Sequence, residues 1–95
     1  MVKITWTEQS LNDVENIAQF IAIDSEKYAK VQVARFFNQS LILETFPYSG
    51  RIVPELNRSD IRELIQGNYR IIYKIISEYQ IDILTIHHSR RQLKI

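Results

Sequence analysis

The sequence contains no cysteine, only two glycines and two prolines, and no long apolar run. Without cysteine the chain can form neither a disulfide framework nor a thiolate metal site. Gly50 and Gly67 stand apart, so there is no glycine-rich loop of the kind that cradles phosphate. No segment approaches the roughly 18 apolar residues needed to span a bilayer, and the N-terminal residues lack the apolar stretch of a signal peptide. We therefore expect a cytoplasmic protein that binds neither a membrane nor a cofactor.

What the sequence does contain is the composition of a globular protein. Its 95 residues are 45% hydrophobic and 24% charged, which predicts one soluble domain over residues 1–95 with a single modest core. The net charge of +1 conceals an uneven distribution. Every charged residue from Glu8 to Glu26 is acidic, whereas from Pro47 onward lysine and arginine outnumber acidic residues by eight to five. The basic half permits a local site for an anionic ligand, although a surface mixed for solubility is an open alternative.

The first half of the chain reads as one short strand and two helices. Residues 2–6 are rich in strand formers, and Thr7 is a suitable N-cap for a helix that runs to about Ile23. The apolar stripe of this helix consists of Leu11, Val14, Ala18 and Ile21. Ser25 can cap a second helix that ends before Pro47, with an apolar side formed by Ala29, Val33, Phe36 and Leu43. The two-residue break between them predicts an αα-hairpin.

From Pro47 onward the pattern changes to that of strands. A turn at residues 47–50 leads into irregular or edge structure around Pro54. Three segments enriched in isoleucine and tyrosine follow, separated by turns at Gly67-Asn68 and at 77–80, and these are residues 61–65, 69–76 and 81–87. The predicted fold is therefore α+β: an N-terminal strand, an αα-hairpin, then an antiparallel β-meander with the helices packed on one face of the sheet.

Strand alternation decides which side chains share a face. Arg70 and Lys74 lie on the side opposite the apolar and aromatic set Tyr69, Ile71, Tyr73 and Ile75. The adjacent histidines His87 and His88 point to opposite faces, so together they cannot chelate one ion, and we expect no metal site. A buried, unpaired Arg70 is costly. It must reach a phosphate or the open face, or else form a structural ion pair with Glu55 or Glu63.

Several short motifs occur in a characteristic order after the two helices. They are Gly50-Arg51-Ile52-Val53-Pro54-Glu55, Ile61-Arg62-Glu63-Leu64, Tyr69-Arg70-Ile71-Ile72-Tyr73 and His88-Ser89-Arg90-Arg91. This order resembles the RelE/ParE family of small bacterial toxins, and the resemblance covers nearly the whole chain. It implies the toxin half of a type II toxin–antitoxin pair, neutralised within a hetero-oligomer by a small antitoxin protein.

The RelE branch of the family implies an enzyme, and it is the first preference from sequence. Such a toxin cleaves mRNA on the ribosome without metal, through attack of the ribose 2′-hydroxyl on its own phosphate. Arg70 matches the arginine that contacts the scissile phosphate, and Arg91 matches a catalytic-site arginine. His88, or Glu55 by similarity to the YoeB-like subgroup, would move protons. The remaining RNA or phosphate contacts would come from Arg51, Arg62, Lys74 and Arg90.

The ParE branch implies a different activity, which is inhibition of DNA gyrase through protein binding with no catalytic residue. Two departures from the nuclease pattern favour it. RelE-type nucleases have lysines on the strand before the Tyr-Arg motif, where this chain has Ile61 and Glu63. Their late tyrosine also has no counterpart in the 95 residues. A third alternative is a degenerate toxin that acts only as the partner of its antitoxin.

Overall fold

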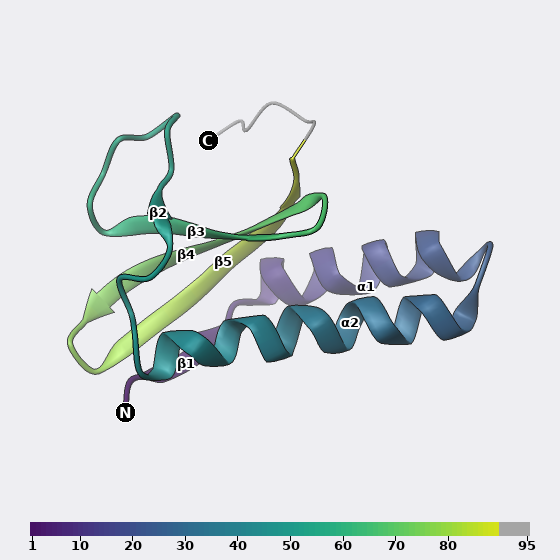
Figure 1. Ribbon diagram of the computed structural model, residues 1–95, viewed down its shortest axis with the longest axis horizontal. Coiled ribbons are helices and arrows are strands. Elements are labelled where there is room, and N and C mark those ends of the chain that lie inside the picture. Colours follow the sequence, from purple (N-terminus) through teal and green to yellow (C-terminus); the bar gives the residue numbers. More distant parts are fainter. Residues whose placement is uncertain (90–95) are drawn as a thin grey trace.

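The computed structural model describes residues 1–89 and shows one five-stranded sheet with two helices on one of its faces (Figure 1). This arrangement confirms the predicted α+β class. The elements, in chain order, are β1 (Lys3–Trp6), α1 (Glu8–Ala22), α2 (Glu26–Ser40), the 3₁₀ turn η1 (Leu41–Glu44), β2 (Arg51–Ile52), β3 (Ile61–Gln66), β4 (Tyr69–Ser77) and β5 (Gln80–His88).

The strands lie in the order β1-β5-β4-β3-β2. The predicted antiparallel meander is formed by β3, β4 and β5. The N-terminal strand completes one edge by pairing parallel to β5, with Lys3 beside Gln80, and the two-residue β2 closes the other edge against β3. Parallel neighbours need a long connection. The αα-hairpin is part of that connection between β1 and β5, and it thereby lies across one face.

Both predicted helix caps are present. The Thr7 hydroxyl accepts a hydrogen bond from the Ser10 amide at 3.2 Å, and the Ser25 hydroxyl accepts one from the Tyr28 amide at 3.0 Å. Thr7 also donates to the carbonyl of Ile83 at 2.8 Å, which fixes the start of α1 to β5. The second helix is shorter than predicted, because it tightens into η1 after Ser40 instead of continuing towards Pro47.

The main core fills the space between the helices and the sheet. Val14, Phe36 and Leu43 come from the helical side and are buried against strand residues, namely Leu64, Ile71, Tyr73, Ile81, Ile83 and Ile86. Leu11, which the sequence placed in the apolar stripe, is instead 46% exposed. The face of β4 that carries Ile71 and Tyr73 is therefore the face covered by the helices.

A second, smaller core lies on the opposite face of the sheet. Val53, Ile61 and Ile72 are buried there, with Leu56 and Leu84 packed against them. Val53 and Leu56 belong to the connection between β2 and β3, residues 53–60, which we call the β2–β3 loop. This loop covers part of the face that the helices leave open, and it lies over the same side of β4 as Arg70.

Gly50 occupies a position where no side chain fits. Its amide donates to the Tyr73 hydroxyl at 3.0 Å, and that hydroxyl donates to the Pro47 carbonyl at 2.9 Å. A Cβ at Gly50 would lie 2.6 Å from the backbone oxygen of Glu63 and 2.7 Å from the Tyr73 hydroxyl. The turn can therefore approach β3 and β4 this closely only because the residue is glycine.

We predict that Gly50→Ala lowers the free energy of unfolding by about 2 kcal/mol or more, because the added methyl must displace backbone or the buried tyrosine. Urea denaturation followed by circular dichroism measures this change. Gly67→Asn is the matched control, since a Cβ at Gly67 meets nothing within 4 Å and asparagine tolerates the left-handed conformation found there. Equal losses in the two variants would contradict the steric explanation.

Candidate functional site

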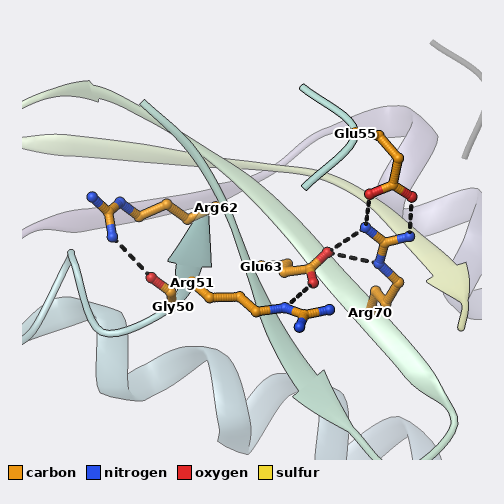
Figure 2. A network of polar contacts seen from close by, with 6 residues as sticks. All are labelled: Gly50, Arg51, Glu55, Arg62, Glu63 and Arg70. Atoms are coloured by element: carbon orange, nitrogen blue, oxygen red, sulfur yellow. Dashed lines mark hydrogen bonds and ion pairs between the residues drawn. The ribbon is translucent and has the colours of Figure 1, made fainter. Parts of the chain in front are cut away.

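Arg70 lies at the centre of a network of charged side chains on the face opposite the helices (Figure 2). Its two terminal nitrogens donate to the two carboxylate oxygens of Glu55, each at 2.7 Å. Its Nε and one terminal nitrogen lie 2.6 Å from one oxygen of Glu63 on the neighbouring strand β3. The structural ion pair that the sequence left open is therefore formed, and with both candidate glutamates.

Glu63 is the most deeply buried member of this network, with a fully covered side chain. Its second carboxylate oxygen accepts from Arg51 Nε at 2.5 Å, while the side chain of Arg51 itself is 61% exposed. Two arginines thus balance two glutamates, and the network of Arg51, Glu55, Glu63 and Arg70 has no net charge. Burying a carboxylate is tolerable here because both its oxygens are hydrogen-bonded to cations.

The network changes the acidity of its members. The hydrogen bonds from Arg70 are the main cause that lowers the pKa of Glu55 from an ordinary 4.5 to about 2. The same bonds raise the pKa of Arg70 further above its already high value. A carboxylate with so low a pKa is a poor proton acceptor near neutrality, since efficient general bases have a pKa near the working pH. This weakens the case for Glu55 as a general base.

The other predicted phosphate contacts do not converge on Arg70. The guanidinium of Arg62 lies 5.0 Å from the centre of the Tyr48 ring, and it donates to the carbonyls of Gly50 and Ser59, each at 3.0 Å. Arg62 therefore joins two loops on the edge of the sheet. Lys74 is half-buried on β4 in register with Asp82 on β5. Arg90 and Arg91 lie outside the described residues.

The two histidines occupy opposite faces of the sheet, as predicted. His88 is in register with Tyr69 and contacts the edge of its ring, with the ring centres 5.4 Å apart. This places His88 on the helix-covered face, away from Arg70. His87, which the sequence did not single out, is in register with Arg70 and contributes to lowering the pKa of Glu55. A proton-transfer role for His88 beside Arg70 is therefore not supported by the geometry.

A feature that the sequence did not reveal is a cleft of about 530 Å³ between α1 and the end of β5. Its walls include Asn16, Phe20 and Tyr69, together with Gln9, Asp13, Ile17 and residues 85–88. Asp13 accepts a hydrogen bond from the Ile86 amide at 3.1 Å and another from the Thr85 hydroxyl. No sequence signal marks this cleft, because it depends on how far β5 extends beyond the short β1.

Two further properties concern residues 1–89 only. In this range no group of three or more histidine, cysteine, aspartate or glutamate side chains is arranged to hold a metal ion. None of the helices in the same range has the length and apolar character needed to cross a membrane.

Comparison with known proteins identifies the branch of the family. A family model described as the ParE toxin of the type II toxin–antitoxin system parDE matches residues 4–93. Among solved structures, the chromosomal ParDE toxin–antitoxin system from P. aeruginosa contains a chain that superposes with a TM-score of 0.75 at 19% identity, covering 93% of this chain and 96% of the other. No curated protein sequence matches significantly. The family match favours the ParE form over the RelE form that the sequence analysis preferred.

We predict that Arg70→Ala lowers the free energy of unfolding by roughly 3 kcal/mol, because it removes one cation from the fully buried carboxylate of Glu63. Chemical denaturation at pH 7 measures the loss. Arg58→Ala is the control, since Arg58 pairs with Asp60 on the exposed surface and should matter little. If Arg70→Ala were as stable as Arg58→Ala, the network would not be a structural element.

We also predict an acid-sensitive contribution from Glu55. Its pKa is lowered in the folded state, so the Arg70 pair contributes fully above pH 4.5 and is lost as the pH falls towards about 2. Between those values wild type should lose more unfolding free energy than Glu55→Gln, which has no carboxyl group to protonate. Urea titrations at a series of pH values test this, with Glu78→Gln in the exposed β4–β5 turn as the control. Parallel pH profiles for wild type and Glu55→Gln would refute it.

Proposed function

The chain belongs to the ParE toxin family of type II toxin–antitoxin systems, and from this we propose that it inhibits DNA gyrase by binding it, without catalysis. As a toxin of such a system it has an antitoxin as its partner. We propose that the two form a hetero-oligomer in which the antitoxin blocks the toxin. RNA cleavage on the ribosome, the first preference from sequence, is the alternative outcome of the test below.

The proposal rests on the observation that the hydrogen-bond donors of Arg70 are already taken up by carboxylates. A nuclease of the RelE form needs its arginine directed at the scissile phosphate, where it stabilises developing charge. Here the Nε and both terminal nitrogens of Arg70 donate to carboxylates, and its side chain is only 7% exposed. A phosphate would have to displace Glu55 and approach the buried carboxylate of Glu63. This arrangement is better suited to stabilising the fold than to catalysis.

The exposed apolar side chains supply what a protein-binding toxin needs. The far end of the αα-hairpin extends past the strands (Figure 1), and there Phe20 and Ile23 are 75% and 80% exposed. A second group follows α2, where Phe46 and Tyr48 are 60% and 61% exposed. Exposed apolar surface on a small domain commonly marks contacts with other proteins. It supports binding to gyrase, to the antitoxin, or to both in turn.

We predict that the purified protein inhibits supercoiling by purified DNA gyrase, and that its induction in cells causes double-strand DNA breaks while messages stay intact. Supercoiling assays and mapping of mRNA ends measure the two effects. The antitoxin should abolish both, because it competes for the toxin's surface.

The matched variants are Phe20→Ser and Arg70→Met. The first removes an exposed apolar group and should weaken inhibition without loss of stability if the hairpin end contacts gyrase. The second retains the bulk of the arginine, so a folded Arg70→Met protein should still inhibit gyrase. Messages cut within codons on ribosomes, with 2′,3′-cyclic phosphate ends that Arg70→Met no longer produces, would establish the nuclease instead.

A further inference from the structure

We propose that Glu55 occupies a carboxylate-binding site on Arg70, and that an acidic side chain of a protein partner can replace it there. The site consists of the two terminal nitrogens of Arg70, which face Glu55 on the β2–β3 loop, while one of them also contacts Glu63 (Figure 2). Under the proposed function the natural partner is the antitoxin or the target. The chemistry of the site itself does not depend on which of them supplies the acid.

The first argument is the unequal burial of the two carboxylates that Arg70 holds. The side chain of Glu63 is fully covered and comes from strand β3, whereas the side chain of Glu55 is 36% exposed and comes from a loop. Both make short hydrogen bonds, but only Glu55 can be reached from solvent. The bidentate pairing of an arginine with a carboxylate is specific in geometry, and any carboxylate of a partner can form the same pair.

The second argument is the way the β2–β3 loop is attached. At its start Val53 is fully buried, and its carbonyl accepts from the Asn57 amide at 2.9 Å. At its end the Asp60 carbonyl accepts from the Ile75 amide at 2.7 Å. Between these anchors, Glu55 ties the exposed middle of the loop to Arg70. Release of that one side chain therefore leaves both ends of the loop in place.

The third argument is the charge balance, which selects a carboxylate over a phosphate. Arg51 and Arg70 carry two positive charges, and Glu63 with one further carboxylate neutralises them. Exchange of Glu55 for an external carboxylate restores the two lost hydrogen bonds and keeps the network neutral. A phosphate group would bring additional negative charge and a third oxygen next to buried Glu63, where like charges repel.

The surroundings of the site indicate what flanks the incoming acid. Ile65, the cross-strand neighbour of Arg70, is 49% exposed. A partner segment that places one aspartate or glutamate on Arg70 would thus meet the apolar side chain of Ile65. The fitting partner is a protein segment with an apolar residue next to its acidic one.

The test is chemical rescue in the Glu55→Ala variant, which empties the site. Sodium acetate, compared with sodium chloride at equal ionic strength, should raise the melting temperature of this variant by about 4 °C or more near saturation. Acetate should leave wild type unchanged, because Glu55 occupies the nitrogens at high effective concentration. Inorganic phosphate should rescue less than acetate. A blocked Leu-Glu-Leu peptide should rescue at lower concentration than acetate, and Leu-Gln-Leu should not rescue.

Two further variants control the experiment. Glu55→Gln keeps an amide in the place of the carboxylate, so it blocks the site sterically and should not respond to acetate. Asp60→Ala removes a negative charge from the same loop but not from Arg70, so it should not respond either. An equal response of all variants, or of phosphate and acetate, would overturn the carboxylate site. None of these measurements involves gyrase or RNA, so the outcome is independent of the proposed function.

Discussion

The structure depends most on the burial of one carboxylate, that of Glu63. Its oxygens are held by Arg70 from the adjacent strand β4 and by Arg51 from the edge strand β2. A fully buried charged group in a small domain is tolerated only with such compensation. The requirement fixes Arg51 close to β3, which explains how a strand of two residues remains attached to the sheet. It also orients Arg70 so that its outer nitrogens can hold Glu55 and the β2–β3 loop.

This dependence has a consequence for function. An arginine committed to structural carboxylates is not readily available to stabilise a transition state, and a glutamate whose pKa is lowered to about 2 does not readily accept a proton at neutral pH. The family pattern that in the RelE branch forms a phosphate site here forms a neutral network. The surfaces proposed to bind partners are instead the exposed apolar side chains at the hairpin end and after α2. To these we add the terminal nitrogens of Arg70, where a partner carboxylate is proposed to replace Glu55.

Much of the fold was predictable because it follows from local patterns. Thr7 and Ser25 are good caps, the apolar residues recur at helical spacing, and Gly67-Asn68 permits a tight hairpin with a left-handed glycine at φ 59°. The alternation along β4 correctly separated Arg70 from Ile71 and Tyr73. The sequence also restricted the partners of Arg70 to a phosphate, open solvent or two glutamates. Its family resemblance identified the toxin family.

Other features were decided only by tertiary structure, because they depend on the pairing of distant segments. A register shift between β4 and β5 changes the alternation along β5, so that Ile81 and Ile83 share the helix-covered face with Ile86 instead of with residues 85 and 87. This shift places His87, and not His88, on the side of Arg70, and counting along the chain cannot reveal it. The assembled sheet likewise determines the parallel pairing of β1 with β5 and the cleft beside α1. It also determines that Arg70 pairs with both glutamates. The sequence by itself determined the elements and the family, whereas the packed sheet determined which charged groups meet.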